Sequence, residues 1–240
     1  MRVFHKDALE VRVYDDRAAL GRAAAAAVAA RISEVLAGKP EVNIVFAAAP
    51  SQNEFLAALV EMELDWGRVN GFHMDEYVGL AADAPQGFGN FLKAGLFGRV
   101  PFGRVYYLGG DSQQYAQLLL EYPTDIVALG IGENTHLAFN DPHVARFDDP
   151  VLVKTVDLDE ACRQQQVHDG CFETLEQVPT HALTLTIPAL MRARFVYAIV
   201  PGARKAEAVA HTLEDEISER YPSTILRQHP NAVLFIEKGK

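Results

Sequence analysis

Short apolar runs alternate with helix-like segments along almost the whole chain, and this alternation restricts the fold more than any other feature of the sequence. The runs have the length of strands and are apolar at nearly every position, which is typical of strands covered on both faces. Strands connected through helices pair in parallel, with right-handed crossovers that place helices on both sides of the sheet. The pattern therefore predicts a three-layer α/β sandwich with a mostly parallel central sheet.

The expected elements can be placed by residue number. Strands are expected at 42–47, 68–74, 104–108, 125–129, 151–156, 182–187, 194–200 and 232–237. Helices are expected at 16–36, 53–63, 87–96, 111–120, 159–167, 204–213 and 223–227. Asp15 or Asp16 can cap the first helix, and Gly38 is suited to end it. Because no repeat or linker divides the chain, residues 1–240 are expected to form a single domain.

Charge and cysteine content narrow the classes of function. The formal net charge of -10 at pH 7 disfavours general binding to nucleic acids or anionic membranes. The alanine-rich run at 23–30 is too short to span a bilayer, and the N-terminus has no apolar core of signal-peptide length. Cys162 and Cys171 fit neither a redox motif nor a zinc knuckle and are expected to be reduced thiols. We therefore expect a cytoplasmic protein with no nucleic-acid or membrane partner.

A glycine-punctuated turn with a histidine follows the expected strand 125–129. Gly130 and Gly132 allow the backbone to bend sharply and to approach a ligand closely. His136 can take up and release a proton near neutral pH, and Asp141, held before a proline, could fix its tautomer. A single histidine of this kind is more often a hydrogen-bonded loop residue, so the case for a site depends on a second acidic loop.

The second acidic loop is Asp75-Glu76, at the end of the expected strand 68–74. Adjacent side chains on an extended backbone point to opposite faces, so only one carboxylate can face a cleft and the other should bond to backbone or solvent. The functional interpretation is that Asp75 moves a proton between adjacent substrate carbons. The alternative is a solvated turn.

Groups that could bind an anion are expected at the same edge of the sheet, because parallel strands present their carboxyl ends together. Lys205 lies at the start of a helix, where free N–H groups and the helix dipole favour an anion. Ser51 and Gln52 lie in a strand-to-helix turn that lacks the glycines of a phosphate loop, although Ser51 can offer a hydroxyl. Arg163, in an unusually polar helix, could belong to a lid. For each residue the alternative is an ordinary solvated side chain.

A metal site is a minority alternative. Its ligands would come from His73, Asp75, His136, Asp141 and His143. The sequence has neither a helical HExxH pair nor a cysteine set, so no metal is expected.

Taken together, these segments resemble the glucosamine-6-phosphate deaminase family, whose sugar-phosphate isomerases are related more distantly to 6-phosphogluconolactonases. The resemblance covers essentially the whole chain. Its motifs are FHMDEYVGL at 72–80, GIGENTHLAFNDP at 130–142, VPTHALTLTIPALM at 178–191, VPGARKAEAV at 200–209 and ILRQHPNAVLF at 225–235. The resemblance implies a modified Rossmann-like α/β sandwich that needs no metal or organic cofactor. Family members occur as single chains and as rings, so a homo-oligomer is one expectation.

The resemblance also implies a reaction. In that family an amino-sugar 6-phosphate ring opens, a proton moves between C2 and C1, and ammonia leaves, which here predicts conversion of glucosamine 6-phosphate to fructose 6-phosphate. Asp75 matches the proton carrier, His136 the ring-opening histidine and Asp141 its carboxylate partner, which is usually a glutamate. Lys205 matches the phosphate-binding lysine. The candidates for further substrate contacts are Ser51, Gln52, Glu76, Asn134 and Arg163.

Several positions depart from the family pattern. Asn134 stands where a carboxylate often supports the histidine, and Thr135 replaces a glycine, which would strain the loop or alter its path. Residues 48–51 replace a phosphate loop of glycine and threonine, and the arginine that clamps phosphate has no clear match. These departures leave two other functions open: a 6-phosphogluconolactonase-like hydrolase, in which His136 activates water, and a non-catalytic sugar-phosphate sensor. The hydrolase does not explain Asp75, because hydrolysis needs no base for a carbon acid.

Overall fold

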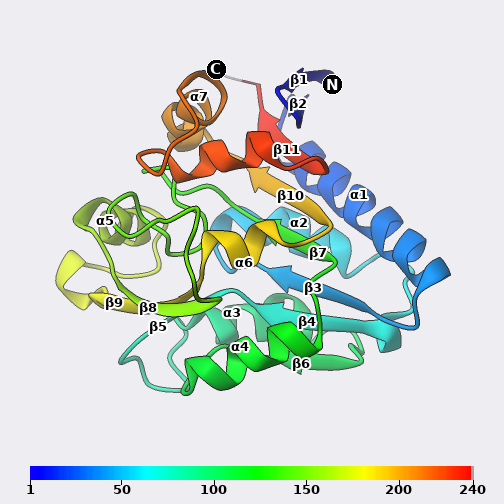
Figure 1. The fold of residues 1–240 in the computed structure, drawn as a ribbon, viewed down its shortest axis with the longest axis horizontal. Coiled ribbons are helices and arrows are strands. Elements are labelled where there is room, and N and C mark those ends of the chain that lie inside the picture. The colour runs from blue at the N-terminus through cyan, green and yellow to red at the C-terminus, as the bar shows by residue number, and fades with distance from the viewer. Residues whose placement is uncertain (239–240) are drawn as a thin grey trace.

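The computed structural model describes residues 1–238 and contains two sheets (Figure 1). The main sheet has eight strands in the order β1-β2-β11-β10-β7-β3-β4-β6, and every neighbouring pair except β1–β2 is parallel. Its strands are β1 (Arg2–Lys6), β2 (Leu9–Tyr14), β3 (Val42–Phe46), β4 (Val69–His73), β6 (Arg104–Tyr106), β7 (Ile126–Leu129), β10 (Phe195–Val200) and β11 (Ala232–Glu237). The predicted α/β fold with a mostly parallel central sheet is confirmed.

The second sheet is small and antiparallel, with the strand order β5-β9-β8. Its strands are β5 (Asp75–Tyr77), β8 (Val153–Asp157) and β9 (His181–Leu185). The α-helices are α1 (Arg17–Gly38), α2 (Asn53–Leu59), α3 (Phe88–Leu92), α4 (Ser112–Glu121), α5 (Glu160–His168), α6 (Ile187–Met191) and α7 (Ala206–Glu214). In Figure 1, α4 and α6 cross the face of the main sheet nearest the viewer. No helix within residues 1–238 is both long and apolar enough to cross a membrane.

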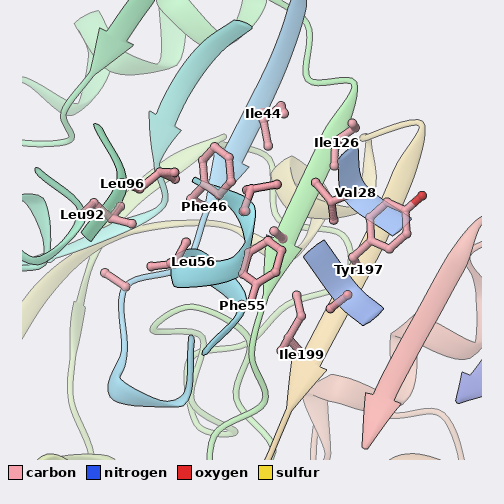
Figure 2. Close-up of a cluster of buried hydrophobic side chains, with 14 of the residues drawn as sticks. Val28, Ile44, Phe46, Phe55, Leu56, Leu92, Leu96, Ile126, Tyr197 and Ile199 are labelled. Carbon is pink, nitrogen blue, oxygen red and sulfur yellow. The ribbon is translucent and has the colours of Figure 1, made fainter. Parts of the chain in front are cut away.

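Successive residues of the central strands pack into two separate hydrophobic cores, one on each face of the main sheet. In β3, Ile44 and Phe46 belong to the core built with α1 and α2, whereas Val45 belongs to the core built with α4 and α6. Figure 2 shows the first of these cores, in which Phe55 and Leu56 of α2 pack beside β3. Because both faces of the strand are buried, every position of β3 is buried, which explains its unbroken apolar pattern.

The small side chains of α1 let this long helix pack closely. Asp16 caps its first turn by accepting a backbone hydrogen bond of 2.7 Å, as predicted. A Cβ on Gly21 would lie 2.6 Å from the Cβ of Glu54, so α1 and α2 meet where glycine leaves space. The predicted stop at Gly38 is slightly early, because Gly38 is still helical and Lys39 is the C-cap.

The arrangement of the strands differs from the prediction in two places. The N-terminal residues form the antiparallel hairpin β1–β2, which extends the main sheet and turns at Asp7 with a φ of 51°. A strand with one exposed face carries a weaker apolar signal than a doubly buried one, which explains why the hairpin was not expected. The expected strands at 151–156 and 182–187 are present as β8 and β9, but they join β5 in the antiparallel sheet instead of the parallel one.

Candidate active site

A cleft lies at the carboxyl ends of β3, β7 and β10, where the loops that follow these strands meet. It encloses about 450 Å³, the space open to solvent included. Its polar lining consists of Ser51, Asp75, His136, Gln165, Gln166 and Lys205. The two glutamines come from α5 and were not among the predicted site residues; their only signal in the sequence is the unusual polarity of a helix that packs on the core.

Asp75 is held in the cleft by the pairing of β5 with β9, in which it lies opposite Thr184. Its side chain is buried, and Oδ1 has no hydrogen-bond partner within the described residues. Burial raises the pKa of Asp75 well above its usual value, and the charge of Glu76 adds to this effect. A carboxyl group with a raised pKa and a free oxygen can accept a proton from a carbon acid and return it.

Glu76 points away from the cleft. Its Oε1 accepts a hydrogen bond of 3.1 Å from the backbone N–H of Phe88, and its Oε2 accepts one of 2.9 Å from that of Gly89. The expectation that only one of the two adjacent carboxylates faces a cleft is therefore confirmed. Glu76 does not line the cleft, because both of its oxygens bond to the start of α3, and its role in substrate binding stays a prediction.

His136 and Asp141 lie together in the loop after β7. Nδ1 of His136 is 3.0 Å from Oδ1 of Asp141, off the ideal direction for a hydrogen bond, and both side chains are buried. Burial alone would raise the pKa of Asp141, but the neighbouring His136 ring, with donors from Asn134 and the Asp159 backbone, outweighs it and lowers that pKa. Asp141 is therefore ionised near neutral pH and orients the imidazole, which leaves Nε2 for a ligand.

The backbone of this loop is shaped around the imidazole. A Cβ on Gly132 would lie 2.2 Å from Cε1 of His136, so only glycine leaves room for the ring. Thr135 has a φ of 71°, a conformation that is costly for a β-branched residue, and the predicted strain at this position is confirmed. A hydrogen bond of 3.0 Å from the backbone N–H of Ser223 to the Thr135 carbonyl helps to hold the strained turn.

Two other candidates for substrate binding lie outside the cleft lining. Nδ2 of Asn134 donates to Oδ1 of Asp141 at 3.0 Å, so the amide lies behind the histidine–carboxylate pair. The guanidinium of Arg163 donates to the carbonyls of Leu175, at 2.6 Å, and Val178, at 3.0 Å. Neither side chain lines the cleft, because each bonds to other parts of the chain, and direct substrate contacts by Asn134 and Arg163 stay a prediction.

Of the side chains expected to bind an anion, some line the cleft and one holds the turn behind it. Lys205 is buried at the start of α7 and lines the cleft; burial lowers its pKa, while Asp169 and Glu133 act in the opposite direction. Ser51 lines the same cleft. Gln52 lies behind it and donates both to Oγ of Ser51 and to the carbonyl of Ile199, each at 3.1 Å. The glutamine therefore ties the turn to β10, and Lys205 and Ser51 remain available to a ligand.

Two groups of side chains bring possible metal ligands within 4.8 Å of one another: His136, Asp141 and Cys162, and Asp141, His143 and Asp159. Burial, with the charge of Asp141, raises the pKa of Cys162 well above its usual value, whereas a metal would need the thiolate.

His73 accepts a backbone hydrogen bond of 3.2 Å at Nδ1, and burial lowers its pKa to about 3. His73, the last residue of β4, is therefore a neutral structural residue.

Comparison with known proteins places these features in context. The sequence model of the family described as glucosamine-6-phosphate isomerases/6-phosphogluconolactonase matches residues 15–235. A glucosamine-6-phosphate deaminase of Bacillus cereus is 35% identical over 214 residues, which cover 86% of this chain and 80% of the relative. One of Streptococcus sanguinis is 34% identical over 199 residues, covering 80% of this chain and 83% of the relative.

Solved structures share the fold. A structure described as a monomeric glucosamine-6-phosphate deaminase superposes with a TM-score of 0.85 at 26% identity, covering 95% of this chain and 97% of that one. The 6-phosphogluconolactonase of Thermotoga maritima gives a TM-score of 0.75 at 20% identity, with 95% and 99% of the two chains covered. At that identity the second likeness is evidence of the fold alone.

Proposed function

Because the chain belongs to the glucosamine-6-phosphate isomerase/6-phosphogluconolactonase family, we propose that it is an isomerising deaminase that converts glucosamine 6-phosphate and water to fructose 6-phosphate and ammonia. The main support is the shared cleft: a buried carboxyl group with a free oxygen, Asp75, lines the same cavity as the His136–Asp141 pair. The relatives named as glucosamine-6-phosphate deaminases favour the same reaction.

Ring opening is the task that suits His136. Asp141 holds Nδ1, so Nε2 can take the proton of the C1 hydroxyl and return one to the ring oxygen as the C1–O5 bond breaks. The ionised carboxylate stabilises the imidazolium that forms between these two transfers. The product is the open-chain aldehyde, whose carbonyl makes the hydrogen on C2 acidic.

Proton transfer between the carbons is the task that suits Asp75. Its carboxylate removes the proton from C2, and the aldehyde oxygen takes up a proton to give an enol. Asp75 then delivers its proton to C1 as the amine gives up one of its own, which leaves an imine at C2 and a hydroxyl at C1. Water adds to this imine and ammonia leaves, so the ketose phosphate forms without any change in overall oxidation state. Burial raises the pKa of Asp75, which makes its carboxylate a stronger base for this transfer.

Lys205 and Ser51 suit the phosphate end of the substrate. The ammonium offers charge-assisted hydrogen bonds to phosphate oxygens, and the Ser51 hydroxyl offers a further donor. Gln165 and Gln166 can add amide donors from α5. Cys162 and Cys171 are free, which accords with a reducing cytoplasm as the place of action.

One assay tests the proposal. Purified protein is incubated with glucosamine 6-phosphate, and ammonia and fructose 6-phosphate are measured separately, with 6-phosphogluconolactone as the alternative substrate. Equal amounts of the two products, formed by the wild type but not by Asp75→Asn, would support the deaminase. Hydrolysis of the lactone without ammonia release from the amino sugar would instead favour a lactonase. Binding without turnover of either compound would favour a sensor.

A further inference from the structure

One amide lies between two carboxylates behind the His136 ring. Nδ2 of Asn134 donates to Oδ1 of Asp141 at 3.0 Å and also faces both oxygens of Asp159, at 3.3 and 3.2 Å. An amide nitrogen carries two hydrogens, so it can serve one carboxylate with each. The Asn134 amide thus bridges the carboxylates of Asp141 and Asp159, neither of which can donate a hydrogen bond while ionised.

The orientation of this amide is set by the backbone. Oδ1 of Asn134 accepts the backbone N–H of His136 at 3.2 Å, which turns Nδ2 toward the carboxylates. Asp159 is anchored independently, because its Oδ1 accepts the backbone N–H of Cys162 at 2.6 Å and caps α5. The backbone N–H of Asp159 also donates to Oδ2 of Asp141 at 3.2 Å. Both oxygens of Asp141 therefore receive a hydrogen bond from this arrangement.

We propose that Asn134 and Asp159 are a matched pair of positioning residues, which together hold Asp141 in register with His136. The inference rests on the proposed function, in which the histidine opens the sugar ring. The carboxylate of Asp159 is held in place by the start of α5, and the Asn134 amide bridges it to Asp141. The start of α5 is thereby connected to the His136–Asp141 pair. The same helix brings Gln165 and Gln166 into the cleft.

The pairing constrains which residue types can occupy the two positions. A carboxylate at 134 would keep the bond from the His136 backbone. It would also place a third carboxylate beside Asp141 and Asp159 without the side-chain amide that now faces both, which is repulsive. An amide at 159 would keep the helix cap, since asparagine and aspartate cap almost equally well, but it would remove the negative charge that Nδ2 of Asn134 faces. Each single exchange is therefore unfavourable, and the double exchange restores the number of charges.

The test uses Asp159→Asn, Asn134→Asp and the double variant of the full chain, with Asp148→Asn as the control. Asp148 is an exposed carboxylate that bonds to Arg146, so the control makes the same change of charge on the surface. Turnover of glucosamine 6-phosphate is measured as kcat and KM. The imidazole N–H proton of His136 is followed by NMR and assigned by its absence from His136→Gln.

We expect Asp159→Asn to lower kcat about tenfold with KM nearly unchanged, since one charge-assisted hydrogen bond is lost. The His136 N–H signal should move or broaden, while the melting temperature and the control stay unchanged. Asn134→Asp should be impaired at least as much, and the double variant should recover part of that loss. A His136 signal that is the same in Asp159→Asn as in the wild type would overturn the proposal, as would a double variant no better than Asn134→Asp. The NMR readout does not need turnover, so an inactive wild type would count against the proposed function and leave this test intact.

Discussion

The imidazole of His136 occupies the space that a side chain on Gly132 would need: a Cβ there would lie within 2.4 Å of three atoms of the ring. The two residues belong to one short turn, and the backbone N–H of Gly132 also donates to the carbonyl of His136 at 2.9 Å. The position of the His136 ring therefore depends on glycine at 132, because any side chain there would displace the ring.

We predict that Gly132→Ala displaces the His136 ring and lowers kcat by about a hundredfold, because ring opening depends on its position to within a fraction of an ångström. Unfolding free energy should fall by about 1–3 kcal/mol through overpacking. Steady-state kinetics and thermal unfolding check this. Gly109→Ala is a control for glycine replacement away from the cleft, because its Cβ would meet nothing within 4 Å and its φ is not positive. Wild-type kcat in Gly132→Ala would show that the ring can move without cost.

Asp75→Asn should lower kcat by about 10²–10⁴-fold, the usual contribution of a general base, while substrate still binds. The amide has the same shape as the carboxyl group but cannot take the proton from C2. Solvent hydrogen exchange at C2 of the substrate, followed by NMR, reports this step directly. If exchange at C2 continues at the wild-type rate in the variant, another group is the base.

The same substitution should change stability in a pH-dependent manner. The pKa of Asp75 is raised in the folded state, so the folded chain binds this proton more tightly than the unfolded chain, and stability falls as pH rises above the usual carboxyl pKa of 3.8. Asp75→Asn does not titrate, so it should be more stable than the wild type at pH 7, by about 1.4 kcal/mol for each pH unit that separates the two pKa values. The advantage should vanish near pH 4. Denaturant unfolding of both proteins between pH 4 and pH 8 measures it, and parallel curves would contradict the argument.

Lys205→Met should raise KM for glucosamine 6-phosphate by about 10–100-fold, because a charge-assisted hydrogen bond to phosphate is lost. Arg204→Met is the matched control. The Arg204 guanidinium donates to the carbonyl of His168 at 2.8 Å and is not part of the cleft lining. Salt dependence of KM offers a second check, since it should flatten in Lys205→Met alone. An equal rise of KM in both variants would show that the loss of a positive charge matters wherever it lies near the cleft, and that Lys205 does not contact the phosphate specifically.

Arg163→Met should lower stability and leave substrate binding intact. Its guanidinium bonds to the carbonyls of Leu175 and Val178, and these acceptors would lose their partners. We expect a loss of about 1–3 kcal/mol in unfolding free energy and a KM within about twofold of the wild type. A large rise in KM at unchanged stability would restore Arg163 as a substrate ligand.

Much of the architecture could be predicted because its causes are local. Strands such as β3 and β7 are buried at every position and almost entirely apolar, and the cap at Asp16 is visible in the sequence. The hairpin β1–β2 was harder to predict because one of its faces is exposed to solvent and carries polar residues. The pairing of β8 and β9 with β5, outside the main sheet, depends on contacts between segments far apart in the chain.

The sequence by itself determined the three-layer fold, the strand-end positions of Asp75, His136 and Lys205, and the family to which the chain belongs. Only the tertiary structure decided which partner each polar side chain takes. It turned Glu76 onto α3 and set Asn134 between two carboxylates, one of them 25 residues away. The physical reason is that apolar burial follows a local period, whereas a hydrogen bond depends on the position and direction of a partner that the fold alone brings near.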